Sequence, residues 1–181
     1  MQKSLGHLML DLETMGSVSN SVITSIGAVE FDIATGETGR TFYERINIQS
    51  CLNFGLKVTG STIQWWLTQN QTAREETAKD GDDLFTVLNK FNEFIKELDD
   101  FTLQVWGNSA RFDNGLLEDA YIAIGRNIPW NFRTERDVRT LVALRPDIKK
   151  NMPNIGTEHL PIDDCLFQIS YCSTIYRDLN P

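Results

Sequence analysis

Hydrophobic and polar residues alternate with a period of two along the first part of the chain. Residues 7–14, HLMLDLET, begin apolar on both faces, which is typical of a central, buried strand. Residues 21–32 and 39–48 form two more strand-like runs, separated by the turn sequence ATGE at 34–37. The pattern predicts three consecutive strands that pair as an antiparallel meander.

The hydrophobic positions then take the period of a helix. Residues 61–79 begin with a Ser or Thr cap and place Ile63, Trp66 and Leu67 on one face, so they predict a single helix. Residues 82–100 predict a second, amphipathic helix. Its apolar stripe consists of Leu84, Leu88, Phe91, Phe94, Ile95 and Leu98.

Strands and helices alternate in the second half of the chain. Residues 101–108 predict a strand, 112–125 a helix that ends at a glycine, and 130–146 a short strand followed by a short helix that a proline stops. The last helix runs roughly from Asp163 to Leu179. This order favours an α/β fold whose sheet mixes antiparallel and parallel strands.

Composition points to one domain in a reducing compartment. The 181 residues are 41% hydrophobic, enough for a substantial core, and no linker or repeat divides residues 1–181. Three cysteines without a C-x-x-C pair argue against a disulfide framework or a structural zinc site and favour the cytoplasm. The apolar run near the start is short and contains Asp11 and Glu13, so it predicts neither a signal peptide nor a membrane anchor.

The net charge limits how this protein can bind nucleic acid. A value of −8 argues against covering many phosphates with Lys and Arg. Bound divalent cations would change this locally. If four carboxylates held two such ions, their four positive charges would reduce −8 to −4, and the site itself would attract anions.

Acidic residues stand where the first predicted strand ends. Asp11 and Glu13 project from one face because strand side chains repeat every two residues. Ligand sites in α/β sheets gather at strand ends. The alternative is a pair of solvated charges at a strand terminus, which is the more common meaning of an isolated D-x-E.

Two more acidic residues begin predicted helices. Asp113 follows the strand VWGN and heads the apolar stripe of its helix, while Asp164 lies in the first turn of the last helix, just after His159. Taken singly, they would be helix caps and a surface histidine. Taken together with the first pair, they predict a pocket of oxygen ligands suited to two Mg²⁺ or Mn²⁺ ions, since Zn²⁺ favours more His or Cys.

In this arrangement the chain resembles the DEDDh 3′→5′ exonucleases of the ribonuclease H-like superfamily. LMLDLET is similar to their first motif, VWGNSARFDNGLL to their second and HLPIDD to their third, H-x4-D. STIQWWLTQNQTAR and RDVRT resemble the phage and prophage branch, the DexA-type and exonuclease VIII-like proteins. The resemblance covers nearly the whole chain and implies a ribonuclease H-like α/β fold, with a mixed five-stranded sheet flanked by helices.

The resemblance also implies a role for each site residue. Asp11, Glu13, Asp113 and Asp164 would be ligands of two Mg²⁺ or Mn²⁺ ions, with Asp11 bridging them. His159 would be the general base, because histidine changes protonation near neutral pH. Asp163 competes with Asp164 for the ligand position, but the H-x4-D spacing favours Asp164.

The function expected from the resemblance is that of a 3′→5′ exodeoxyribonuclease. Its partner would be nucleic acid, namely the 3′ ends of single-stranded DNA, in the cytoplasm of a bacterium or a phage-infected cell, with an oligomer possible and no membrane involved. One alternative is an exoribonuclease acting on short RNA. Another is a catalytically silent module that binds nucleic acid or serves as an adaptor.

Several further residues are candidates for substrate contact. They are Thr14, Met15, Asn108 and Trp65; Trp65 could stack on a base, whereas Trp66 shares a face with Ile63 and is expected in the core. Three arginines could bind phosphate or pair with nearby acids, and the sequence leaves both readings open for Arg111, Arg136 and Arg139.

Overall fold

The computed structural model describes residues 4–98 and 100–181. A five-stranded sheet has the strand order β3-β2-β1-β4-β5. Strands β1, β2 and β3 pair antiparallel, whereas β4 and β5 run parallel to β1. This arrangement confirms the predicted mixed sheet. The strands are β1 (His7–Thr14), β2 (Ile23–Phe31), β3 (Thr38–Arg45), β4 (Gln104–Gly107) and β5 (Glu135–Asp137).

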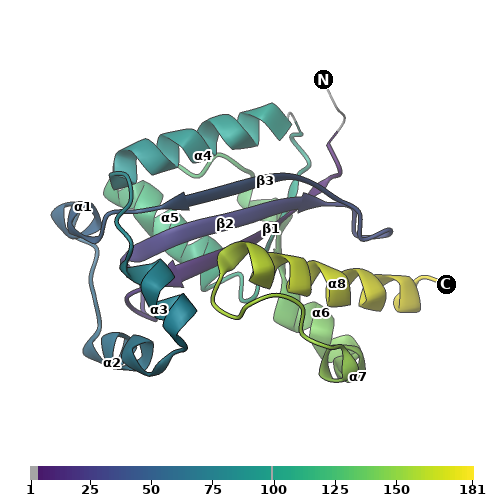
Figure 1. Cartoon of the computed structure of the whole chain (residues 1–181). Coiled ribbons are helices and arrows are strands. Elements are labelled where there is room, and N and C mark those ends of the chain that lie inside the picture. Colours follow the sequence, from purple (N-terminus) through teal and green to yellow (C-terminus); the bar gives the residue numbers. More distant parts are fainter. Residues whose placement is uncertain (1–3, 99) are drawn as a thin grey trace.

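Helices cover both faces of this sheet (Figure 1). The longest helices pack on opposite sides, α4 with α5 on one face and α8 with α6 on the other. The helices are α1 (Ile48–Asn53), α2 (Gly60–Thr68), α3 (Gln71–Ala78), α4 (Leu84–Leu98), α5 (Asp113–Ala123), α6 (Val138–Leu144), α7 (Pro146–Asn151) and α8 (Pro161–Leu179), and a 3-10 turn spans Phe132–Thr134. None of the helices in the described ranges has the length and apolar character to cross a bilayer.

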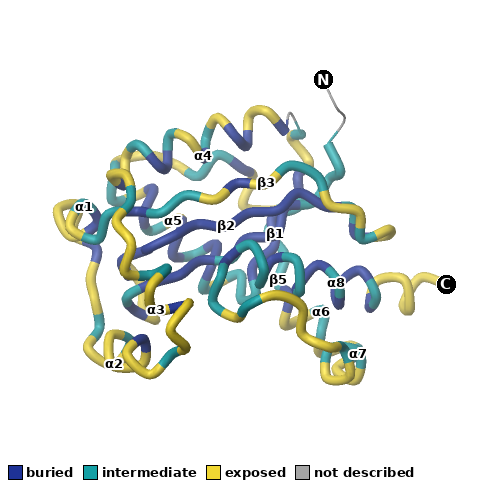
Figure 2. The backbone as a smooth tube through the Cα atoms, viewed as in Figure 1, coloured by how far each residue is buried: buried dark blue, intermediate teal, exposed yellow. Residues whose placement is uncertain are grey.

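The alternation along β1 separates the two core clusters. Leu8, Leu10 and Leu12 pack into the cluster beneath α4 and α5, whereas Met9 belongs to the cluster beneath α8. The central strands β1 and β2 are the most continuously buried part of the backbone, while α2 and α7 are largely exposed (Figure 2). Because odd-numbered residues of β1 face α8, Asp11 points to the side of the sheet where α8 begins.

Two glycines let helices approach the sheet next to the acidic residues. Gly27 pairs with Asp11 across β2 and β1, and a Cβ atom at Gly27 would lie 2.4 Å from Cβ of Pro161, the first residue of α8. A Cβ atom at Gly107, the last residue of β4, would lie 3.0 Å from Cβ of Asp113. The missing side chains therefore admit the first turns of α8 and α5, which carry Asp164 and Asp113.

The single helix predicted over residues 61–79 is wrong. The chain breaks after α2, and the side chain of Asn70 accepts a hydrogen bond from the backbone N–H of Ala73, which starts α3. Trp66 is buried as predicted, but Ile63 and Leu67, expected on the same apolar face, are 41% and 67% exposed. Helix α2 thus rests on the sheet through one tryptophan.

Other element boundaries also differ from those predicted. The third strand ends before Asn47, whose side chain accepts from the N–H of Ser50 and caps the unpredicted helix α1. Pro146 both follows α6 and begins α7, because proline fits the first turn of a helix, where its missing N–H costs nothing. The helix predicted over residues 82–100 ends at Leu98 as described, and Asp99 lies outside the described residues.

Candidate active site

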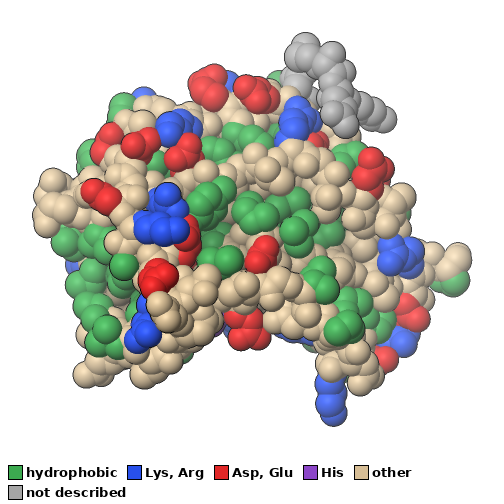
Figure 3. Space-filling model, viewed as in Figure 1, with side chains coloured by type: hydrophobic (Ala, Val, Ile, Leu, Met, Phe, Trp, Pro, Cys, Tyr) green, Lys and Arg blue, Asp and Glu red, His purple; other side chains and the backbone are tan. Residues whose placement is uncertain are grey.

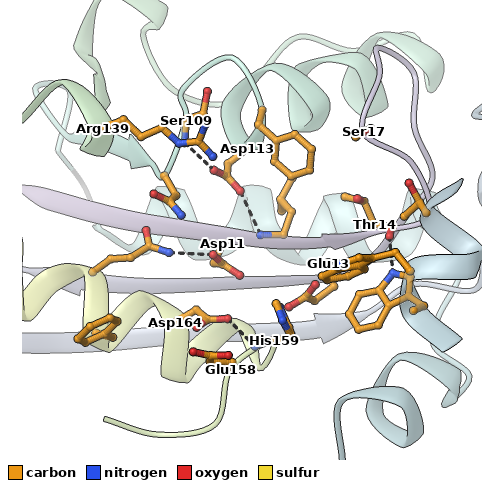
Figure 4. A pocket seen from close by; sticks show the side chains of 18 of the residues that line it. Asp11, Glu13, Thr14, Ser17, Ser109, Asp113, Arg139, Glu158, His159 and Asp164 are labelled. Atoms are coloured by element: carbon orange, nitrogen blue, oxygen red, sulfur yellow. Dashed lines mark hydrogen bonds between the residues drawn. The ribbon is translucent and has the colours of Figure 1, made fainter. Parts of the chain in front are cut away.

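Five residues singled out in the sequence line a single cavity of about 860 Å³. They are Asp11, Glu13, Asp113, His159 and Asp164. The cavity lies where the end of β1 meets the first turns of α5 and α8, and Figure 4 shows these side chains pointing toward a common space. The structure thus brings together residues that lie up to 153 positions apart, from Asp11 to Asp164.

Each of two carboxylates in the cavity is held by a neighbouring donor. Gln168, one turn beyond Asp164 in α8, donates from Nε2 to Oδ1 of Asp11 over 2.8 Å. Asp113 accepts from the backbone N–H groups of Leu12 and Ser109, both at 3.3 Å. Asp113 is the first residue of α5, but its carboxylate accepts from strand β1 and from the loop before the helix, and among the described residues no side-chain hydrogen bond caps α5.

The third motif forms a tight turn just before α8 and in its first turn. The backbone N–H of His159 donates to Oδ2 of Asp164 over 2.8 Å, and His159 has a φ of 65°. Its imidazole meets the ring of Trp65 edge-on, with 5.0 Å between centroids, and that of Trp66 at 5.9 Å. Trp66 in turn donates from Nε1 to the carbonyl of Thr14 over 2.8 Å. Helix α2 thereby sets the position of the histidine relative to β1.

Glu13, His159 and Asp164 each offer one atom that could bind a metal ion, a carboxylate oxygen or an imidazole nitrogen. These three atoms all lie within 4.8 Å of one another. Asp11 and Asp113 line the same cavity and add two further carboxylates. Such an oxygen-rich set with one imidazole fits Mg²⁺ or Mn²⁺ better than zinc, which favours nitrogen and sulfur ligands. The side-chain Oε1 of Gln168 is buried without a partner in the described part of the chain, so this corner of the site has unused capacity for a bound water or ion ligand.

Burial, assisted in two cases by neighbouring acids, raises the pKa values of the carboxyl groups in the cavity. Burial, followed by the charges of Asp164 and Asp113, raises the pKa of Glu13 to about 8. Burial raises the pKa of Asp113 to about 6, although backbone N–H donors oppose the shift. Burial and the neighbouring acids also raise the pKa of Asp11 well above its usual range. These carboxyl groups cannot easily all be ionised at once. A bound cation would stabilise their ionised forms.

The candidates for substrate contact separate into two groups. Thr14, Asn108 and Trp65 line the cavity, and Trp65 is 44% exposed. Met15 packs against the core and is not among the described residues that line the cavity. Asp163, the rival of Asp164 for the ligand position, accepts from the N–H of Thr157 over 2.8 Å and is not among the described residues that line the cavity.

The three arginines whose roles the sequence left undecided differ in their position relative to the cavity. Arg139 lines the cavity, whereas Arg136 donates to backbone carbonyls of residues 133 and 135. Of the described residues, neither Arg111 nor Arg136 belongs to the cavity lining. Several lining residues had no predicted role. Among them are Gln168, which a spacing of four from Asp164 on one helix face could have indicated, and Lys149, which lies on the unpredicted helix α7.

Comparison with known proteins places this arrangement among nucleases. A family model described as the 3'-5' exoribonuclease Rv2179c-like domain matches residues 6–176. The exodeoxyribonuclease of Enterobacteria phage T4 is 29% identical over 158 residues, which cover 74% of this chain and 69% of the phage protein.

Solved structures share the fold at low sequence identity. The nuclease domain of 3'hExo, a DEDDh family member bound to rAMP, has a TM-score of 0.65 and 15% identity, over 95% of this chain and 92% of that one. Cell-death related nuclease 4 has a TM-score of 0.70 and 13% identity, and this chain spans 64% of its length. These similarities confirm the predicted ribonuclease H-like fold.

Proposed function

Because the chain belongs to the family of 3'-5' exoribonuclease Rv2179c-like domains, and with it to the DEDDh exonucleases, we propose that its cavity hydrolyses the last phosphodiester bond at the 3′ end of a nucleic-acid strand. The observation that carries the proposal is the meeting of Asp11, Glu13, Asp113, Asp164 and His159 in one cavity. Bound divalent cations would supply positive charge that stabilises the developing negative charge on the attacking and departing oxygens.

The carboxylates of the cavity would hold these cations. Glu13 and Asp164, whose oxygens lie close to the His159 ring, would share one ion, and Asp113 would hold the other. Asp11 lies between the two groups, with its Oδ1 fixed by Gln168, and would bridge them. Mg²⁺ and Mn²⁺ suit this donor set because they prefer oxygen ligands.

His159 acts as the general base. Its ring lies beside Glu13 and Asp164, so a ring nitrogen can take the proton of a water placed for attack on the phosphorus. The leaving 3′ oxygen of the preceding nucleotide departs on the opposite side. The contacts of His159 with Trp65 and Trp66 would orient the ring. Trp65, Thr14 and Asn108 line the same cavity and would contact the substrate.

DNA is the proposed substrate, and RNA is the second candidate. The phage relative that is 29% identical is an exodeoxyribonuclease, which favours DNA. The matching family is described as exoribonuclease, which favours RNA. On the face shown in Figure 3, the described Lys and Arg side chains stand in small groups among Asp and Glu, so we expect the enzyme to release a long strand between successive cleavages.

Digestion of matched oligonucleotides tests the proposal. DNA and RNA strands of one sequence, labelled at the 5′ end, should shorten one nucleotide at a time from the 3′ end with Mg²⁺ or Mn²⁺ and remain intact with EDTA. The Asp11→Ala variant should be inactive because a ligand is lost. Faster cleavage of RNA than DNA would select the second candidate. Absence of any metal-dependent cleavage by the wild type would overturn the proposal and favour a binding module.

A further inference from the structure

The charged residues of the cavity are unevenly distributed. Five carboxylates line it, including Glu158, but Arg139 and Lys149 are the only Lys or Arg among its described lining residues. In Figure 4, Arg139 lies at the side of the cavity away from Thr14, with Asp11 and Asp113 between them. Arg139 therefore lies at one end of the cavity, opposite Thr14 (Figure 4).

Helix α8 leads from the carboxylates to this end. Asp164, Gln168 and Tyr171 all line the cavity at spacings of four and three, so they share one helix face. Lys149, on α7, holds its Nζ 5.0 Å from the centre of the Tyr171 ring. Since a helix rises about 1.5 Å per residue, Tyr171 stands about 10 Å along the axis from Asp164.

Arg139 and Lys149 are available to bind an anion. Some other basic residues are held by acids: Arg45 pairs with Glu76, Lys90 with Glu44, and Arg145 with Asp178. Within residues 4–98 and 100–181, no ion pair involves Arg139 or Lys149. A guanidinium offers two parallel donors that match phosphate oxygens, and an ammonium adds a compact charge.

The chemistry at the 3′ end of a strand indicates which anion Arg139 and Lys149 would bind. On the 3′ side of the scissile phosphate there is one nucleoside and no further phosphate. On the 5′ side every nucleotide adds one. The end with the exposed Trp65 suits the lone nucleoside, and the end with Arg139 and Lys149 suits the continuing strand.

We propose, building on the exonuclease function above, that Arg139 and Lys149 form a subsite for a phosphodiester on the 5′ side of the scissile bond. A stacked strand rises about 3.4 Å per nucleotide, so a span of about 10 Å places the contacted phosphate within about three nucleotides of the scissile one. The subsite also fixes the direction of the strand, with its 3′ nucleoside toward Trp65.

Neutralising single phosphates tests the subsite. Short oligonucleotides with one uncharged methylphosphonate at the first, second or third linkage upstream of the scissile bond are compared with the all-phosphate strand, using Mn²⁺ throughout. For the wild type, one of these positions should lower kcat/KM by about tenfold to a hundredfold, the loss expected for a charge-assisted hydrogen bond. In the Arg139→Gln/Lys149→Gln double variant, the same methylphosphonate should cause little further loss, because the partner is already gone.

Control variants and a minimal substrate complete the test. Lys150→Gln and Arg133→Gln remove one charge each outside the cavity and should keep the methylphosphonate effect. The p-nitrophenyl ester of thymidine 5′-monophosphate has no upstream phosphate, so the double variant should lose at least tenfold more activity on the oligonucleotide than on the ester. Equal losses on both substrates, or equal methylphosphonate sensitivity in wild type and double variant, would overturn the subsite alone. A wild type that cleaves neither substrate would overturn the exonuclease function as well.

Discussion

Gln168 donates a hydrogen bond to Asp11 over 2.8 Å from a position that is only 3% exposed. The bond joins α8 to the central strand and fixes one carboxylate oxygen, so the other is turned toward the cavity. Asp11 is a proposed metal ligand, and a buried residue that orients such a side chain affects how tightly the metal ion binds.

Replacing Gln168 by Leu should weaken Mn²⁺ binding by about tenfold to a hundredfold, the usual cost of losing such a partner. Isothermal titration of the metal-free protein with Mn²⁺ measures it directly. Gln49→Leu, at an exposed glutamine that does not line the cavity, is the matched control. Unchanged Mn²⁺ affinity in Gln168→Leu would show that Asp11 needs no support from α8.

His159→Ala should lower turnover by about 10²–10⁴-fold, the usual contribution of a general base, and leave Mn²⁺ binding largely intact. The other histidine provides the control. His7 accepts from Nε1 of Trp106 over 3.0 Å, so His7→Ala should cost about 1–3 kcal/mol of unfolding free energy for the orphaned donor and spare turnover. Near-normal turnover of His159→Ala would remove that residue from the chemistry.

The stability of the metal-free protein should fall as pH rises through the neutral range. Glu13, whose pKa is raised from 4.5 to about 8, binds more protons when folded than when unfolded. Its contribution is therefore fully present below about pH 4.5 and is lost as pH rises to about 8. The shifts of Asp11 and Asp113 act in the same direction.

Thermal unfolding in EDTA across this pH range tests the expectation. The Glu13→Gln variant should show a shallower decline than the wild type because it has no proton to lose. Added Mg²⁺ should raise the wild-type midpoint more at about pH 8 than at about pH 5.5, where protons compete with the cation. Parallel curves for the two proteins would mean that Glu13 ionises freely.

Gly27→Ala should damage the site from outside it. The new Cβ atom would lie 2.4 Å from Cβ of Pro161, so the start of α8 must move away from β2. We expect a loss of about 1–3 kcal/mol in urea unfolding, typical of overpacking, together with reduced turnover. Gly60→Ala adds the same methyl group where no atom lies within 4 Å and should leave both properties nearly unchanged.

The sequence predicts strand faces better than helix breaks. A period of two assigns Leu10 and Asp11 to opposite faces whatever packs above them, and the structure agrees. The break before α3 depends instead on the side chain of Asn70 capping Ala73, and no Gly or Pro marks it. Local hydrogen bonds of this kind compete with helix propagation on nearly equal terms.

The site shows the same difference. Motif spacing identified the acids and His159, because each lies at a strand end or helix start that can be read locally. Lys149 could not be identified, because its place in the cavity depends on α7 and on the ring of Tyr171. The approach of α8 to the sheet depends on Gly27, which leaves room for Pro161 because glycine has no side chain.

The residues that line the cavity come from elements that differ greatly in burial. Asp11 and Glu13 belong to the buried strand β1, whereas Trp65 and Lys149 project from α2 and α7, short and largely exposed helices (Figure 2). Substitutions in α7 can change the cavity wall without moving Asp11 and Glu13, whereas substitutions at Trp65 would also move the ring of His159. The exposed wall can therefore vary between related proteins at little cost in folding, while the two carboxylates keep the place that the central strand gives them.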